Sequence, residues 1–156
     1  MLRPDNFSDV CLHADCCALA GAAAFFAGIP DAAVVVNGPM WCYFYAMRHL
    51  EDSLPLLSQR MHCTQLDNES IVFGAEDYLR DTLQSYLTEP PAMLCIESNC
   101  SASLIGDDTG GIARDMGIRC PVVVFDSCGL TGGFAEGYAK AAKKLFAQLL
   151  PQTATA

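Results

Sequence analysis

Three stretches of the chain are continuous runs of apolar, largely β-branched residues. They cover residues 32–36, 92–96 and 121–125, and residues 62–64 allow a short fourth strand inside a polar connection. A strand with one exposed face alternates between apolar and polar residues, whereas a strand buried on both faces is a continuous apolar run. The pattern therefore predicts three buried strands and one short additional strand.

The segments between these strands have helical patterns. In the most regular one, leucine and tyrosine recur at steps of three and four residues, which indicates one buried face. The predicted helices span residues 17–28, 40–50, 74–87, 106–116 and 134–149. Helices that alternate with buried strands predict an α/β fold. We expect one Rossmann-like three-layer domain over residues 1–156, with a mainly parallel sheet of about four strands.

The composition narrows the class of protein. Hydrophobic residues make up 52% of the 156 residues and charged residues 17%, which excludes a disordered chain and suggests that another chain covers part of the surface. Eighteen acidic residues against nine Lys and Arg give a net charge of −9. Because phosphate groups would be repelled by this charge, nucleic acid is not expected as a partner.

The N-terminal segment has no apolar core of the kind that secretory signals carry. The most apolar stretch, residues 18–29, is rich in Ala and Gly and covers about half of a bilayer span, so it predicts a buried helix and no membrane partner. We therefore expect a cytoplasmic protein. In that compartment its nine cysteines are buried thiols, redox thiols or metal ligands, because structural disulfides are rare there.

The positions of three cysteines favour a metal site. Cys42 and Cys100 each follow a predicted strand, and parallel strands bring both loops to the same edge of the sheet. Cys17 begins a helix whose N-terminal dipole stabilises a thiolate, a position that Cys16 could share. Three converging thiolates suit an iron–sulfur cluster. The chain has no CxxC pair, which argues against zinc ribbons and thioredoxin-like sites.

For each single cysteine the alternative is a buried thiol without chemistry, since free cysteine is among the residues most often buried. Cys95 and Cys120, in or beside strands, are assigned to the core, whereas Cys128 beside a glycine is a candidate substitute ligand. The aromatic run around Trp41 indicates helix packing or an interface rather than a substrate clamp. No catalytic residue is predicted.

Four segments in order resemble the nitrogenase component 1 family, which includes the nitrogenase subunits and nitrogenase-like reductases. They resemble its first cluster-binding segment, a Glu- and Gly-containing stretch, a third cysteine followed by an IGDD helix start, and the next strand, loop and helix. The segments are CALAGAAAFFAGIPDAAVVVNGPMWC, ESIVFGAEDYL, IESNCSASLIGDD and PVVVFDSCGLTGGFAEGYAKA.

The resemblance implies an iron–sulfur centre, of the [4Fe–4S] type or a larger P-cluster-like type, at a subunit interface. The ligands that it implies are Cys17, Cys42 and Cys100. Gly38 and Pro39 would shape the turn before Cys42, and Gly106 would start the helix behind Cys100. The partners would be a second copy or a paralogous subunit, which shares the cluster, and an ATP-hydrolysing iron-protein reductase.

Two positions depart from the family pattern, with Asn37 in place of the usual His and Trp41 in place of the usual Gly. Component 1 subunits also contain several such domains, and their active-site cavity lies among them. We therefore expect a cluster-binding electron-transfer subunit of a nitrogenase-like two-component oxidoreductase, whose substrate the sequence does not identify. The alternatives are a non-catalytic carrier or assembly scaffold for a metallocofactor, and a domain that kept the fold without the cluster.

Overall fold

The computed structural model describes residues 16–149, and its centre is one sheet of four parallel strands. In spatial order the strands are β2 (Met61–Cys63), β1 (Ala32–Asn37), β3 (Met93–Ser98) and β4 (Val122–Asp126). In the register of the sheet, Val34 pairs with Met61 on one side and with Cys95 on the other. The predicted α/β fold with a four-stranded parallel sheet is confirmed.

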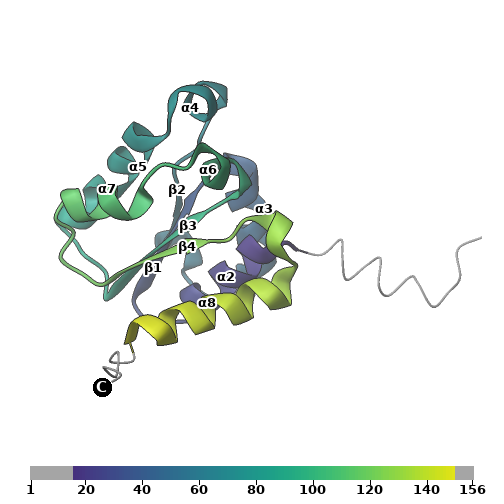
Figure 1. Cartoon of the computed structure of the whole chain (residues 1–156). Coiled ribbons are helices and arrows are strands. Elements are labelled where there is room, and N and C mark those ends of the chain that lie inside the picture. Colours follow the sequence, from purple (N-terminus) through teal and green to yellow (C-terminus); the bar gives the residue numbers. More distant parts are fainter. Residues whose placement is uncertain (1–15, 150–156) are drawn as a thin grey trace, which may run out of the picture.

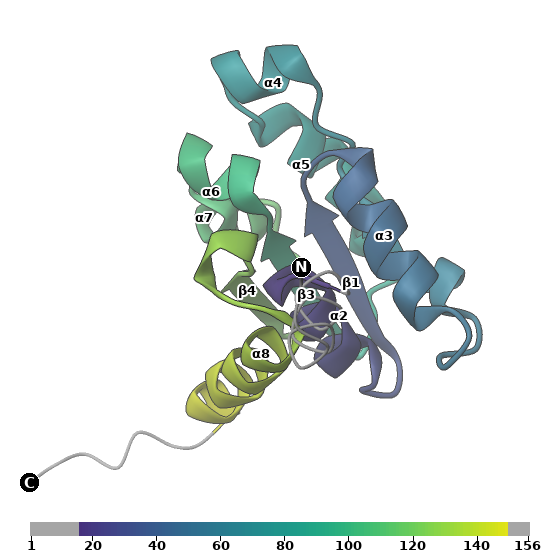
Figure 2. The same ribbon diagram turned by 90° about the vertical axis from the view of Figure 1, so that its right-hand side faces the viewer.

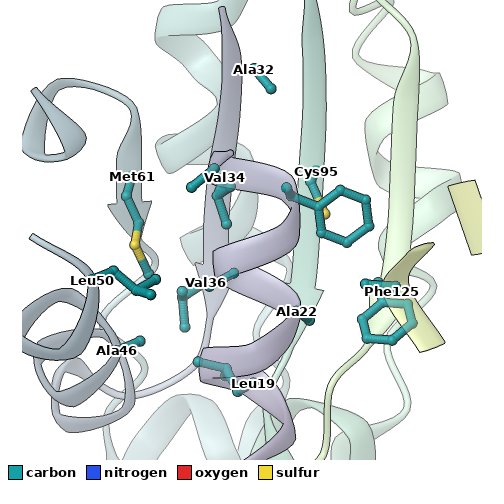
Figure 3. Close-up of a cluster of buried hydrophobic side chains, with 14 of the residues drawn as sticks. Leu19, Ala22, Ala32, Val34, Val36, Ala46, Leu50, Met61, Cys95 and Phe125 are labelled. Atoms are coloured by element: carbon teal, nitrogen blue, oxygen red, sulfur yellow. The ribbon is translucent and has the colours of Figure 1, made fainter. Parts of the chain in front are cut away.

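Three helices cover one face of the sheet: α2 (Ala18–Ala27), α3 (Met40–Leu50) and α8 (Phe134–Leu149). Figure 1 shows α2 and α8 side by side under the strands. In Figure 3, Leu19 and Ala22 of α2 lie over Val34 and Val36 of β1. This layer also contains Cys95, which is fully buried, as predicted.

The opposite face of the sheet carries α5 (Glu76–Leu83), the 3₁₀ helix η3 (Gln84–Leu87) and α7 (Thr109–Asp115). Leu79 and Leu83 of α5 pack there with Val35, Leu94 and Ile96 from the strands. Every residue of β1 is buried, because helices cover both faces. This double burial is the physical origin of the continuous apolar runs in the sequence.

Helices α2 and α8 are in close backbone contact at one glycine in each helix, Gly21 and Gly137. A Cβ atom on Gly21 would lie 1.9 Å from the backbone oxygen of Phe134, and one on Gly137 would lie 2.0 Å from that of Ala18. No side chain fits at such distances, so the helix backbones approach each other only because both positions are glycine. This contact fixes the start of α2, where Cys17 lies.

Some predicted element boundaries are wrong. The helix predicted over residues 74–87 is α5 followed by η3, and the polar connection before it contains a further helix, α4 (Asn68–Phe73). The helix predicted over residues 106–116 is α7, which begins only at Thr109, and a further helix that was not predicted, α6 (Cys100–Ile105), precedes it. The remaining short elements are the 3₁₀ helices η2 (Leu57–Gln59) and η4 (Gly129–Thr131).

Gly106 ends α6, and the prediction that it starts a helix is wrong. Its φ of 78° lies in the left-handed region that glycine adopts after a helix. Asp108 instead begins α7, because its side chain accepts a hydrogen bond from the Gly111 N–H. Within residues 16–149, no helix combines the length and apolarity needed to cross a membrane.

Candidate functional site

Three cysteines from distant parts of the chain lie at the carboxyl edge of the sheet. Cys17 is the residue before α2, Cys42 is in the first turn of α3, and Cys100 is the first residue of α6. Figure 2 faces this region, with α2 in the centre, α3 on one side and α6 on the other. Cys17 is exposed, and the other two thiols are half-buried.

Cys17 and Cys100 meet at Gly129. The Gly129 N–H donates a hydrogen bond of 3.1 Å to the Cys100 sulfur. A Cβ atom on Gly129 would lie 3.6 Å from the sulfur of Cys17 and 3.6 Å from the sulfur of Cys100. The two sulfur atoms are therefore no farther apart than twice that distance, and a side chain at position 129 would fill the space between them.

The backbone around Cys17 is held by the loop after β4. The Ala18 N–H donates to the Gly132 oxygen at 3.1 Å, and Cys17 forms an antiparallel bridge with Gly133. These backbone contacts place the start of α2 against the loop that carries Gly129. The position of the Cys17 thiol is thus set by a segment more than a hundred residues away in the sequence.

Asn99 connects Cys42 to the segment of Cys100. Its amide group donates to the Cys42 sulfur at 3.4 Å, while its side-chain oxygen accepts from the Ala102 N–H at 2.9 Å and caps α6. The buried Asn99 side chain therefore orients the Cys42 thiol and also caps α6, the helix that begins with Cys100. The sequence analysis missed this role, although an Asn directly before a helix is a recognisable capping signal.

The pKa of the Cys42 thiol shows that the three cysteines interact. Burial raises this pKa, the hydrogen bond from Asn99 partly offsets the increase, and the negative charges of Cys17 and Cys100 raise it further. Three thiolates this close repel one another when no cation is present. A cationic metal group would relieve that repulsion and displace the protons.

Gly38 and Pro39 form the turn that leads into α3. The Gly38 N–H donates to the Thr64 hydroxyl at 2.9 Å, and a Cβ atom at Gly38 would lie 2.6 Å from the Asn99 side chain. The Cys42 N–H in turn donates to the Pro39 oxygen at 3.1 Å. The turn is therefore packed directly against the residue that holds the Cys42 thiol.

Two further thiols lie near these three. Cys128, a candidate substitute ligand, is buried, and the pKa of its thiol is raised: a backbone contact at Leu130 lowers it, whereas burial and the neighbouring Cys100 raise it. Cys63 interacts with Cys42, but its thiol donates to the Gly38 oxygen at 3.3 Å, and burial raises its pKa to about 11. Cys63 therefore has the contacts of a structural thiol.

A cavity of about 560 Å³ opens between α2 and α3 beside the cysteines. Its lining includes Cys17 and Cys42 together with the cationic or ionisable groups of Arg48 and His49. Next to it, three aromatic side chains of α3 contact one another and are partly or largely exposed: Trp41, Phe44 and Tyr45. The cysteine site thus adjoins an apolar, exposed helix face.

The donor set fits an iron–sulfur cluster better than a single metal ion. Among the described residues, no three His, Cys, Asp or Glu side chains form a group that could hold one ion. An iron–sulfur cluster needs protein ligands that are farther apart than those of a single ion, because each ligand binds a different iron atom of the cluster. Soft sulfur donors with N–H groups directed at them match this chemistry.

The fold and the converging thiols define a parallel α/β domain with a sulfur-donor site at the carboxyl edge of its sheet. Residues 17–156 match the family described as nitrogenase component 1 type oxidoreductase. The chain belongs to this family, as the sequence resemblance implied.

Individual relatives differ in their named roles. The chain is 30% identical, over 67% of its length, to component CfbD of the Ni-sirohydrochlorin a,c-diamide reductive cyclase complex of Methanothermobacter thermautotrophicus, of which it covers 27%. It is 29% identical, over 83% of its length, to the nitrogenase iron-molybdenum cofactor biosynthesis protein NifE of Clostridium pasteurianum, of which it covers 29%. It is 31% identical, over 74% of its length, to the nitrogenase molybdenum-iron protein alpha chain of Methanothermococcus thermolithotrophicus, of which it covers 26%.

The fold is also similar to a solved structure, nitrogenase Cp1 at pH 5. The TM-score is 0.72 at 27% sequence identity, over 88% of this chain and 30% of the other. The chain therefore spans less than a third of the length of these relatives.

Proposed function

We propose that this chain is the iron–sulfur cluster-binding unit of a nitrogenase-like two-component oxidoreductase. Cys17, Cys42 and Cys100 would ligate a [4Fe–4S] cluster or a larger P-cluster-like centre. The observation that carries this proposal is the convergence of these three thiols at one edge of the sheet, close enough to raise the pKa of Cys42. When bound, the cluster would supply reversible one-electron transfer.

The chain's own residues have defined tasks in this proposal. Each of the three thiols gives up its proton as its sulfur binds iron, so cluster binding depends on pH. Asn99 and the Gly129 N–H donate to two of the sulfurs, orient them and stabilise their negative charge. The N-terminal end of α2 adds a favourable dipole beside Cys17.

The exposed aromatic face of α3 supports a subunit interface next to the cluster. Trp41 is 68% exposed and Tyr45 is 65% exposed, and both lie within one turn of Cys42. Aromatic side chains are enriched in protein interfaces, where their large apolar area is buried. We infer that a second copy or a paralogous subunit covers this face and that an ATP-dependent iron-protein reductase supplies the electrons.

A second candidate function is that of a non-catalytic scaffold or carrier for a cluster or metallocofactor. The similarity to NifE, which is named as a cofactor biosynthesis protein, supports this alternative as well as the alpha-chain similarity supports the first. Both functions require the same cysteine site. They differ in whether the bound cluster exchanges electrons with a substrate or is itself passed on.

Anaerobic reconstitution tests the common site. Wild-type protein should take up iron and sulfide and give an EPR signal after reduction, whereas Cys42→Ala and Cys100→Ala should lose most of both. Cys120→Ala is the matched control, because this half-buried thiol precedes β4 at the opposite edge of the sheet. Unchanged cluster content in the Cys42 and Cys100 variants would refute the assignment.

A second measurement separates the two functions. Dithionite-reduced, reconstituted protein is mixed either with candidate reducible substrates or with a cluster-free acceptor protein. Substrate turnover supports the oxidoreductase, whereas transfer of iron and sulfide to the acceptor without turnover supports the scaffold.

A further inference from the structure

One side of the sheet ends in an open edge strand. β4 is the last strand in the spatial order, and no further strand pairs with it within residues 16–149. Natural edge strands are often protected by lysine, internal proline or a bulge, whereas β4 reads VVVFD. The edge strand on the other side, β2, has only three residues. An apolar edge such as that of β4 is a site at which a further strand can pair.

The register shows which backbone groups of β4 face the open edge. The Leu94 N–H donates to the Pro121 oxygen at 2.9 Å, and the Ser127 N–H donates to the Ser98 oxygen at 3.0 Å. In a parallel ladder, every second residue of a strand directs both its N–H and its C=O to the same neighbouring strand. Alternate residues from 121 to 127 therefore pair with β3. The residues whose backbone groups point to the open edge are Val122, Val124 and Asp126.

A groove of about 420 Å³ lies beside β4. Figure 1 shows the strand between α7 and α8, and both helices contribute to the walls of the groove. Val122 and Val124 belong to its lining and are only partly buried. Two basic side chains line it as well, Arg114 from α7 and Lys144 from α8. The groove therefore offers backbone hydrogen-bonding groups, apolar surface and positive charge to an incoming strand.

The charges at this edge are available to a partner. Lys144 is exposed and forms no ion pair within residues 16–149, and the ion pair of Arg114 with Asp108 is long, at 3.8 Å, and exposed. Asp126, the last residue of β4, is exposed too. The edge thus carries basic groups beside its valines and an acidic group at its carboxyl end.

A strand that follows α8 directly is disfavoured at this edge. Connections between parallel strands of one sheet are right-handed in almost all proteins. The connection from β1 through α3 to β2 crosses the face that also carries α8, and it leads away from β4. A right-handed connection through α8 would lead in that same direction.

We propose that a second copy of this chain pairs with β4 in antiparallel orientation, about a two-fold axis at Val124, so that the two sheets join. In this register Val124 lies opposite its own copy, and Val122 lies opposite the partner subunit's Asp126. The residues that direct their backbone groups to the edge then face one another as the hydrogen-bonded pairs of an antiparallel ladder. The central contact is between valines, and the partner subunit's Asp126 enters the groove that Arg114 and Lys144 line.

This interface goes beyond the proposed function and does not depend on the cluster. The aromatic face proposed as the other interface is on α3, which packs beside β2. Figure 2 shows α3 and β4 on opposite sides of the molecule. Two separate interfaces on one chain allow assemblies larger than a dimer.

The test is made in the Trp41→Ser protein, in which the α3 face contributes least to self-association. Sedimentation equilibrium compares Val124→Pro with Lys144→Glu and with the control Lys143→Glu. Proline at position 124 removes the N–H that points to the edge and leaves the hydrogen bonds between β3 and β4 in place. It should raise the dimer Kd roughly 30-fold, because the two-fold axis makes each substitution remove two hydrogen bonds.

The lysine variants test the charge without disturbing the strand. Lys144→Glu should raise the dimer Kd roughly 5-fold, because it places a negative charge beside the partner subunit's Asp126. Lys143→Glu makes the same change at the next residue of α8, which is also exposed but does not line the groove, and should leave the Kd unchanged. Because both lysines are exposed, these variants keep the fold even where proline would not.

Amide hydrogen exchange locates the contact. When the protein concentration is raised above the Kd, the amides of residues 122–126 should exchange more slowly, while those of the buried strand β1 should not change. Equal exchange of residues 122–126 at every concentration would overturn the inference, as would Val124→Pro and Lys144→Glu proteins that associate as the Lys143→Glu control does. Full protection of these amides in dilute, monomeric protein would also overturn it, because a segment of the same chain would then cover the edge.

The outcome is separable from that of the proposed function. Val124, Lys143 and Lys144 lie outside the cysteine site, so the cluster content of these variants should equal that of the Trp41→Ser protein after anaerobic reconstitution. Loss of dimerisation with full cluster content supports the second interface. Absence of a cluster from every protein would refute the proposed function and leave the pairing of β4 to the association data.

Discussion

Replacing Glu97 by glutamine should change how the stability of the protein depends on pH. Glu97 lies in β3 between Val36 of β1 and Phe125 of β4, and it is fully buried. Neither of its carboxyl oxygens has a hydrogen-bond partner among residues 16–149. The neighbouring Ser127 hydroxyl donates to the Ser98 oxygen at 3.0 Å. It therefore offsets little of the increase that burial causes in the pKa of Glu97.

Burial raises the pKa of Glu97 well above its ordinary value of 4.5, and the carboxyl is therefore protonated in the folded protein over a pH range in which it ionises in the unfolded chain. Below about pH 4.5 both states bind the proton and Glu97 adds no pH dependence. Above that value the unfolded state has lost the proton that the folded state retains. The free energy of unfolding then falls by up to about 1.4 kcal/mol per pH unit, until the pH reaches the raised pKa of the folded carboxyl.

The assay is urea unfolding of cluster-free wild-type, Glu97→Gln and Glu89→Gln proteins at half-unit steps from pH 4 to pH 8. Glutamine has no proton to lose, so the Glu97 variant should lack this slope, while the variant of the exposed Glu89 should follow wild type. Slopes are compared rather than absolute stabilities, because a buried amide also requires hydrogen-bond partners. Parallel curves for wild type and Glu97→Gln between pH 5 and 7 would refute a neutral buried acid.

Three further changes test the packing, the thiol donors and the interface. Gly137→Ala should lower the free energy of unfolding by about 3 kcal/mol, because its Cβ would collide with the backbone of α2. The control is Gly110→Ala, which has space at its Cβ and should be neutral or stabilise the protein by up to about 1 kcal/mol in the same urea series. Asn99→Asp keeps the oxygen that caps α6 and loses the N–H group that donates to Cys42. The midpoint potential of the reconstituted cluster should therefore fall by roughly 60 mV, which is the free energy of one hydrogen bond expressed for a one-electron couple. An unchanged potential in redox titration would contradict that role of the amide. Trp41→Ser should weaken self-association roughly 30-fold in sedimentation equilibrium, as for an interface hot spot, and equal dimerisation of both proteins would place the interface elsewhere.

The sequence determined the architecture because burial on two faces leaves a local pattern. The run at residues 32–36 became β1, which is buried along its whole length, and the helix predicted over residues 134–149 is α8 with both ends as expected. Because the loops after parallel strands lie at one edge of the sheet, the sequence also predicted that Cys42 and Cys100 lie in one region, and the two thiols interact in the structure. Whether these thiols bind iron stays a prediction.

Only the tertiary structure decided the contacts between segments that are far apart in the chain. The sequence does not show that Cys128 neighbours Cys100, or that Gly129 lies between Cys17 and Cys100. It also places Glu97 near the end of a strand, where a carboxylate usually reaches water, whereas the fold buries it completely. Residue patterns record the local period and the average burial of each segment, but these contacts depend on how closely distant helices and loops pack, down to the two glycines at which α2 meets α8.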